Sequence, residues 1–241
     1  MSDEVRSIAN SEAAFARARK VMAGGVSSPL RAFRAVGVPP LFLKEGDGAR
    51  VVDVDGNEYL DMLMGHGALI AGHGHDLIIA ALSKAVGRGT SLGLSTELET
   101  TLAQRLVEAF ATDDGTAPSV ELIRFTTGHT EAAMTAVRLA RAATGRELIL
   151  KASGAYHGHA DALLPEAGSG FLASGQAGTV GIPECVIEQT INFKANDLAS
   201  VVDAFEKHPG RIAGVIVEPV ITQMGVIPPA QGYAQALHAL C

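Results

Sequence analysis

The stretch Thr127-Gly128-His129-Thr130-Glu131 places a small residue, an imidazole and a hydroxyl where a strand-like run gives way to a helix-like one. Free backbone N–H groups at a helix start, beside a glycine and a hydroxyl, form a good cradle for a phosphate. The same residues also suit an ordinary helix start, with Thr127 or Thr130 as the cap and Glu131 favouring the helix dipole. The stretch alone leaves both interpretations open.

A second group of side chains lies in the glycine-rich run Ser153-Gly154-Ala155-Tyr156-His157-Gly158-His159. Tyr156 could stack on a flat ligand, and His157 could donate a hydrogen bond to it. A metal site is disfavoured, because a loop cannot place two imidazoles as a helical i, i+4 pair does and no carboxylate or cysteine completes a ligand set. The run Gly72-His73-Gly74-His75 is better explained as a turn or a helix start.

The third candidate is Glu218, which directly follows the apolar run Gly214-Val215-Ile216-Val217 and precedes Pro219. A carboxylate at the end of a buried strand either belongs to a binding site or caps a turn. Both interpretations stay open for this residue.

An α/β fold would bring these three groups together, because ligands bind beyond the carboxyl ends of parallel strands. After residue 65 the apolar pattern alternates between helix and strand, which predicts a mainly parallel sheet with helices on both faces. Helices are expected at residues 76–86, 96–110, 130–143 and 233–240, and strands at 120–126, 147–152 and 211–219.

The N-terminal segment, residues 1–64, has the pattern of a small α+β unit. A helix is expected over residues 11–22, ending at a glycine pair, and Asp55-Gly56 between alternating apolar residues predicts a hairpin. The remaining residues, 65–241, would form a partial large domain. No strand follows the last helix to cover its apolar face, which predicts that the C-terminal part of that domain is missing.

Composition excludes several classes of function. The chain has 241 residues, 47% of them hydrophobic, and a formal net charge of −7. No cluster of lysine and arginine offers attraction to phosphate backbones or anionic lipids, so neither a nucleic acid nor a membrane is expected as a partner. Two cysteines without metal-ligand spacing suit a reducing compartment, and no signal peptide or membrane span is evident, so a cytoplasmic protein is expected.

The chain resembles the class III, pyridoxal-phosphate-dependent aminotransferases, and within that family the resemblance is greatest to the aminomutase branch. It rests on several stretches taken together, namely GGVSSPLRAF, LFLKEGDGARVVDVDGNEYLD, GTSLGLSTELE, RFTTGHTEAAMTAVRLARAATGR, SGAYHGHADALL with AGSG, and IVEPV followed by PP. The resemblance implies the fold type I architecture of these transferases, pyridoxal 5'-phosphate as the cofactor, and a homodimer.

The resemblance also implies roles for individual residues. The cofactor phosphate would bind at the helix start, and Tyr156 would stack on the pyridine ring. The full cofactor-binding set is Gly128, His129, Thr130, Tyr156, His157 and Glu218. Arg31 would bind the substrate carboxylate, an arrangement that the bidentate guanidinium favours; Ser28 would lie beside the substrate, and Ser169 would belong to a loop that gates the site.

The implied activity is transfer of the amino group within glutamate-1-semialdehyde to give 5-aminolevulinate, a tetrapyrrole precursor. The family uses a lysine that carries the cofactor and an aspartate that pairs with its ring nitrogen, and both lie beyond the point where this sequence stops. None of its lysines, at positions 20, 44, 84, 151, 194 and 207, resembles that lysine in context. The alternatives are a class III transaminase acting between an amino acid and a keto acid, and a truncated, non-catalytic remnant.

Three positions depart from the family pattern, which usually reads Asn-Ser-Gly-Thr-Glu at the phosphate cradle. Here His129 replaces a small residue, His66 stands where an aromatic residue is common, and Gln223 stands where an asparagine is usual. These changes bear on the substrate more than on the fold.

Overall fold

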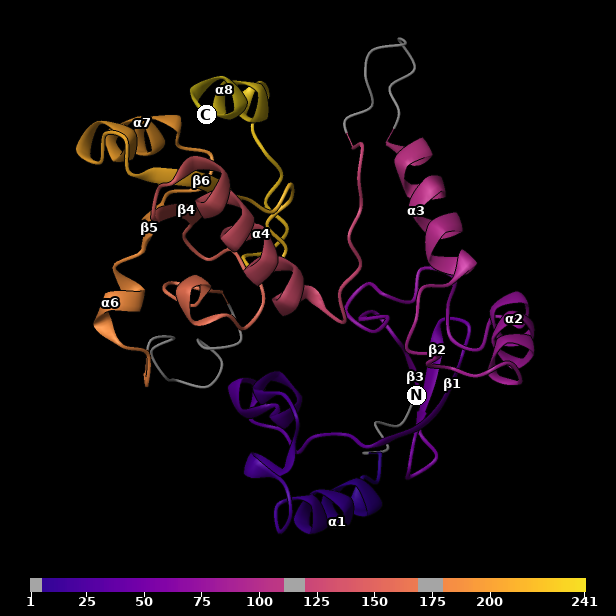
Figure 1. The fold of residues 1–241 in the computed structure, drawn as a ribbon. Helices are drawn as coiled ribbons and strands as arrows, with labels where there is room; N and C mark the ends of the chain where they lie inside the picture. Colours follow the sequence, from indigo (N-terminus) through magenta and orange to yellow (C-terminus); the bar gives the residue numbers. More distant parts are fainter. Residues whose placement is uncertain (1–5, 111–119, 169–179) are drawn as a thin grey trace. The chain divides into compact units, whose positions relative to one another are not determined.

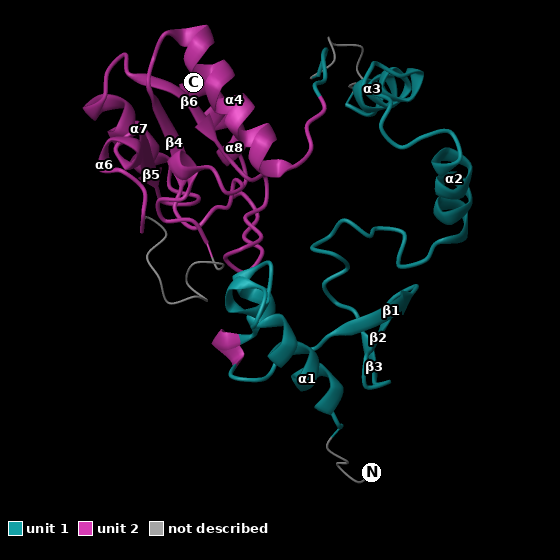
Figure 2. Cartoon of the chain, turned by 60° about the horizontal axis from the view of Figure 1, so that its bottom comes forward, with its two compact units in different colours: residues 1–33, 37–124 teal, residues 34–36, 125–241 magenta. Residues whose placement is uncertain are grey.

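The structure is a computed structural model that describes residues 6–110, 120–168 and 180–241 (Figure 1). The chain forms two compact units (Figure 2): unit 1 holds residues 1–33 and 37–124, and unit 2 holds residues 34–36 and 125–241. Each unit is described separately. The boundary predicted between residues 64 and 65 stays a prediction.

Unit 1 contains an antiparallel sheet with the strand order β1-β2-β3. Its strands are β1 (Leu43–Asp47), β2 (Arg50–Asp53) and β3 (Glu58–Leu60), and its first helix is α1 (Ala9–Ala18). The hairpin predicted around Asp55-Gly56 is confirmed as the β2–β3 connection. Helix α1 ends before Met22, and the glycine pair lies in a short 3-10 helix, η1 (Ala23–Gly25).

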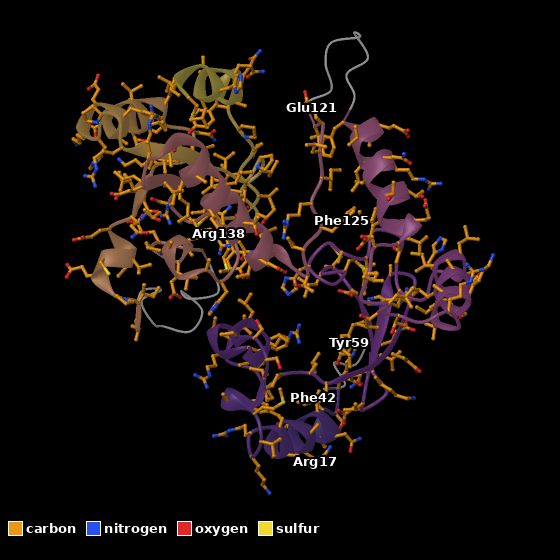
Figure 3. The ribbon with its side chains drawn as sticks, viewed as in Figure 1. Arg17, Phe42, Tyr59, Glu121, Phe125 and Arg138 are labelled. Carbon is orange, nitrogen blue, oxygen red and sulfur yellow. The ribbon has the colours of Figure 1, made fainter. Side chains whose placement is uncertain are left out.

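The hairpin turn is organised by the buried carboxylate of Asp53. Its Oδ1 accepts hydrogen bonds from the backbone N–H groups of Asp55 (2.9 Å) and Asn57 (2.8 Å). Its Oδ2 accepts from the hydroxyl of Tyr59 on β3, at 3.0 Å; Figure 3 labels Tyr59. A buried carboxylate is stable only when its lone pairs are used in this way, so Asp53 serves the turn and not a reaction.

The two longer helices of unit 1 are α2 (Asp76–Val86) and α3 (Glu97–Ala109), both close to the predicted ranges. His75 is the N-cap of α2, so the run from Gly72 to His75 leads into a helix start, as predicted. The strand predicted over residues 120–126 is wrong, because no described residue of this range lies in a strand. A strand needs a neighbour for its N–H and C=O groups, and no described segment pairs with this one.

Unit 2 is built around a parallel sheet with the strand order β5-β4-β6. Its strands are β4 (Leu148–Ala152), β5 (Thr190–Phe193) and β6 (Ile212–Ile216). The central strand β4 pairs in parallel with β5, where Ile149 lies opposite Thr190, and with β6, where Leu150 lies opposite Val215. The parallel sheet expected from the sequence is confirmed.

Helices cover both faces of this sheet (Figure 1). They are α4 (His129–Thr144) on one face, with α7 (Leu198–Lys207) and α8 (Tyr233–Leu240) on the other. Side chains of a strand alternate between its faces, and β4 shows the effect: Ile149 packs with Ala133 and Val137 of α4, whereas Leu150 packs with Val201 of α7. Two shorter elements connect β4 to β5: η4 (Asp161–Leu163) and α6 (Glu184–Ile187).

One strand and two α-helices of unit 2 were not predicted, namely β5, α6 and α7. A signal for α7 is present in the sequence, because Asp197 precedes apolar residues at helical spacing, Leu198, Val201, Val202 and Phe205. Within the part of the chain that the structure describes, no helix has the length and apolar character needed to cross a bilayer.

Candidate functional site

The N-cap of α4 is Gly128, which has no side chain to bond the N–H groups of the first helical turn. It is in an extended conformation, and its carbonyl oxygen accepts a hydrogen bond from the Thr126 hydroxyl at 3.1 Å. Glu131 reaches back to the preceding residue, and its Oε2 accepts hydrogen bonds from the backbone N–H of Thr127 (2.9 Å) and from the Thr127 hydroxyl. A side chain added at Gly128 would meet no atom within 4 Å, so the helix start is open to a ligand.

The hydroxyl of Thr130 connects this helix start to the loop that follows β4. Its Oγ1 accepts a hydrogen bond from the backbone N–H of His159 at 2.9 Å. A hydroxyl that accepts one bond keeps its own proton to donate, which suits contact with an anion. Thr130 lies beside backbone N–H groups that carry the positive end of the helix dipole, and its role as a phosphate ligand stays a prediction.

Gly158 explains why the loop can approach α4 so closely. Its φ is +80°, and a Cβ built on it would lie 2.6 Å from the Cα of Thr130 and 2.9 Å from its Oγ1. Only glycine tolerates both the left-handed backbone and this separation. The glycine in the run Tyr156-His157-Gly158 is thus needed to pack the loop against the candidate phosphate cradle.

Glu218 and Tyr156 join the carboxyl ends of β6 and β4. Glu218 Oε1 accepts a hydrogen bond from the backbone N–H of Tyr156 at 2.5 Å, and its Oε2 accepts from the backbone N–H of Thr222 at 3.0 Å. The carboxylate therefore holds two turns, which is one of the two roles left open for it. The ring of Tyr156 lies edge-on to that of His129, with centroids 5.9 Å apart and planes at 78°.

His157 is almost fully buried and lacks a hydrogen-bond partner at Nε2 among the described residues. Burial lowers its pKa from the ordinary 6.5 to about 4, and the nearby charge of Lys151 acts in the same direction. The imidazole is therefore neutral near pH 7. A buried nitrogen without a partner is uncommon in a folded protein, which makes Nε2 a candidate contact for a ligand.

Lys151 is a further charged residue near these groups, and no sequence motif singles it out. It lies on β4 and is completely buried. Burial lowers its pKa from 10.5 to about 8, against the opposing charges of Glu166 and Glu218. Because lysine is rarely buried without a carboxylate partner, the residue type of Lys151 alone would predict an exposed side chain.

An apolar cavity of about 120 Å³ lies on the other side of Glu218. Its walls include Ala152, Phe193 and Leu237, which belong to the core cluster on the α7 and α8 face of the sheet. Among the predicted site residues only Glu218 reaches it. The cavity is therefore separate from the polar group around Thr130 and His157.

Unit 2 thus brings together six predicted residues from three segments: Gly128, His129 and Thr130 at the start of α4, Tyr156 and His157 after β4, and Glu218 after β6. Arg31, which is exposed, and Ser28, the residue before the 3-10 helix η2 (Pro29–Ala32), belong to unit 1, and their role in binding substrate stays a prediction. Ser169 lies outside the described residues.

Comparison with known proteins identifies the family of the chain. Residues 33–241 match the family model described as aminotransferase class-III. The chain belongs to the class-III aminotransferase family. A curated relative in that family, glutamate-1-semialdehyde 2,1-aminomutase 2 of Bacillus velezensis, is 47% identical over 234 residues, which is 97% of this chain and 53% of the relative.

Solved structures of a transaminase and of an aminomutase resemble the fold over nearly the whole chain. A transaminase with PLP bound superposes with a TM-score of 0.84 at 37% identity, covering 98% of this chain and 53% of that one. A glutamate-1-semialdehyde aminomutase from Pseudomonas aeruginosa PAO1 gives a TM-score of 0.76 at 29% identity, covering 96% of this chain and 49% of that one. The chain spans about half the length of the relatives that it matches.

Proposed function

We propose that this chain is part of an enzyme that uses pyridoxal 5'-phosphate to move an amino group within glutamate-1-semialdehyde, giving the tetrapyrrole precursor 5-aminolevulinate. The observation that carries the proposal is the convergence of an uncapped helix start, the Thr130 hydroxyl and the unpartnered His157 nitrogen at one edge of a parallel sheet. The aminomutase names of relatives that are 44–47% identical support the choice of reaction.

The residues present fit this cofactor. The open helix start and Thr130 suit its phosphate, because backbone N–H groups and a hydroxyl donate to a dianion. The ring of Tyr156 suits stacking on a flat heterocycle, and the buried Nε2 of His157 supplies a polar atom that needs a partner. When bound, the cofactor supplies an electron-withdrawing ring that stabilises negative charge on a substrate carbon.

The protein residues contribute binding and orientation. Glu218 fixes the backbone of Tyr156, so the ring is held at the end of β4 and not on a free loop. His157 is neutral near pH 7, so its ring can donate or accept a hydrogen bond at Nε2 without adding charge to the site. Arg31 is the proposed partner of the substrate carboxylate, and a homodimer is the proposed assembly.

Cofactor binding by the purified chain tests the first half of the proposal. Replacing Thr130 with valine removes the hydroxyl and keeps the shape, so the affinity for pyridoxal 5'-phosphate is expected to fall roughly tenfold, the equivalent of one hydrogen bond to a charged group. Fluorescence titration measures it. The control is Thr144→Val, at the other end of α4, where the hydroxyl donates only within the helix, to Ala140 O. Equal affinity in wild type and Thr130→Val would contradict the assignment.

A class III transaminase is the second candidate, favoured by the 37% identity to a transaminase. An assay of the protein encoded by the complete reading frame separates the two. An aminomutase converts glutamate-1-semialdehyde without an added keto acid, whereas a transaminase requires one. Conversion that depends strictly on pyruvate or another keto acid would remove the aminomutase proposal and leave the cofactor assignment intact.

A further inference from the structure

Lys151 is a completely buried cation on the face of the sheet that carries the candidate site. Because β4 side chains alternate, Lys151 points to the same side as Ile149, which packs with residues of α4. An ammonium in such a place is costly unless several acceptors compensate it, and an apolar residue of similar size would pack there more easily. Its presence therefore calls for a specific use.

The ammonium of Lys151 binds the turn that leads to Tyr156. Nζ donates hydrogen bonds to the carbonyl oxygens of Ala152 and Ala155, both at 3.3 Å. The same turn is closed by a backbone bond from Ala155 N–H to Ala152 C=O at 3.1 Å. Lys151 thus links Ala152 and Ala155, the two ends of the turn that immediately precedes Tyr156 and His157.

Two carboxylates fix the same turn from other sides. Glu218 accepts from the Tyr156 N–H. Glu166 accepts from the Ser153 hydroxyl at 2.5 Å through its side chain and from the Gly154 N–H at 2.8 Å through its carbonyl. The charges of both glutamates favour the protonated form of Lys151. Lys151, Glu166 and Glu218 therefore all bind the short turn that follows β4, and together they fix its position.

We propose that Lys151 is a positioning residue that, through the carbonyls of Ala152 and Ala155, sets the orientation of Tyr156 and His157 at the cofactor site. The expected effect on cofactor binding rests on the proposed function, whereas the hydrogen bonds of Lys151 do not. In this role Lys151 needs no contact with substrate or cofactor. It acts through the turn, and its positive charge also reaches His157, where it opposes protonation of the imidazole.

The test replaces Lys151 with methionine, which keeps the length of the side chain and removes the charge. Two results are expected. The pKa of His157, followed by NMR in the absence of cofactor, rises by about one unit, because a like charge has been removed while Glu218 stays nearby. The affinity for pyridoxal 5'-phosphate falls roughly tenfold. The matched control is Lys207→Met, an exposed lysine on α7 that should change neither quantity.

The arginine variant separates charge from position. Lys151→Arg keeps the charge, so the pKa of His157 stays near its wild-type value, but the wider guanidinium displaces the turn and weakens cofactor binding. If the methionine variant fails to fold, the arginine variant alone decides. A folded variant that binds the cofactor as tightly as wild type, or a methionine variant that loses only stability, would overturn the proposal.

Failure of the proposed function gives a different result. If the wild-type chain does not bind pyridoxal 5'-phosphate, the cofactor assignment falls, but the backbone amide NMR signals of Tyr156 and His157 still report on the turn. Unchanged amide signals of both residues in folded Lys151→Met and Lys151→Arg variants would then overturn the positioning role independently.

Discussion

At the scale of single residues, Gly158 packs directly against Thr130 in the candidate site. Gly158→Ala would force a Cβ to within 2.6 Å of a backbone carbon at a φ of +80°. The control is Gly181→Ala, which has a similar φ of +86° and no atom within 4 Å, so it should cost only the backbone strain of about 1–2 kcal/mol. Gly158→Ala should cost roughly 2 kcal/mol more, as measured by urea denaturation. Equal losses of unfolding free energy in the two variants would show that the loop after β4 can move away from Thr130 without cost.

His157 predicts how stability depends on pH. Its pKa is about 4 in the folded protein and 6.5 in the unfolded chain. Between these pH values the imidazole is mostly protonated in the unfolded chain and mostly neutral in the folded protein. The contribution of His157 is therefore fully present above about pH 6.5 and is lost as the pH falls towards 4. Melting temperatures at pH 7.5 and 5 should differ less in His157→Gln than in wild type.

The exposed residue His238 offers the control for that measurement. His238→Gln should keep the wild-type difference between the two pH values. The same pH dependence in wild type and His157→Gln would show that other groups cause it.

The residues of the site could be predicted to different extents. Thr130 and Tyr156 have recognisable local patterns, namely a hydroxyl at a helix start and an aromatic ring in a glycine-rich loop. In the structure the start of α4 contacts that loop through Thr130 with His159 and through His129 with Tyr156. Lys151 has no such pattern. Its burial results from where β4 lies in the sheet, and the composition of the strand does not reveal this.

At the scale of elements, the start of α7 depends on one side chain. Asp197 is its N-cap, and Oδ1 accepts a hydrogen bond from the backbone N–H of Ser200 at 3.1 Å. Asp197→Ala should lower the free energy of unfolding by about 1 kcal/mol. Asp203→Ala, which removes only an exposed pair with Lys207 on the same helix, should cost less than about 0.5 kcal/mol. A larger loss at Asp203 than at Asp197 would contradict the capping role.

Local patterns located four of the helices well but missed α6, α7 and the strand β5. The predicted ranges of α2, α3, α4 and α8 agree with the structure to within a residue or two, because helical periodicity and capping are encoded nearby in the sequence. The wrong strand at 120–126 and the missed strand β5 have another origin. A strand exists only with a partner, and the partner of β5 is β4, which precedes it by the whole η4 and α6 connection.

At the scale of the whole molecule, α2 exposes several large apolar side chains and buries none of its residues. Leu77 is 75% exposed and Val86 60%. Apolar surface of this kind promotes association, so the purified chain should scatter light increasingly with concentration. Leu77→Glu should reduce that association, whereas Lys84→Glu, on the same helix, should not. Scattering that is independent of concentration in the wild type would contradict this expectation.

The order of the strands in unit 2 has a consequence for synthesis. Since β4 is the central strand, its two edges are filled by segments that follow it in the chain, and Ile149 pairs as far away as Gly214. At about 5–20 residues per second on the ribosome, β4 waits for several seconds with both edges open. During that interval its apolar residues, Leu148, Ile149 and Leu150, are accessible to chaperones and to other nascent chains. The yield of folded protein should therefore depend on the rate of translation and on chaperone supply.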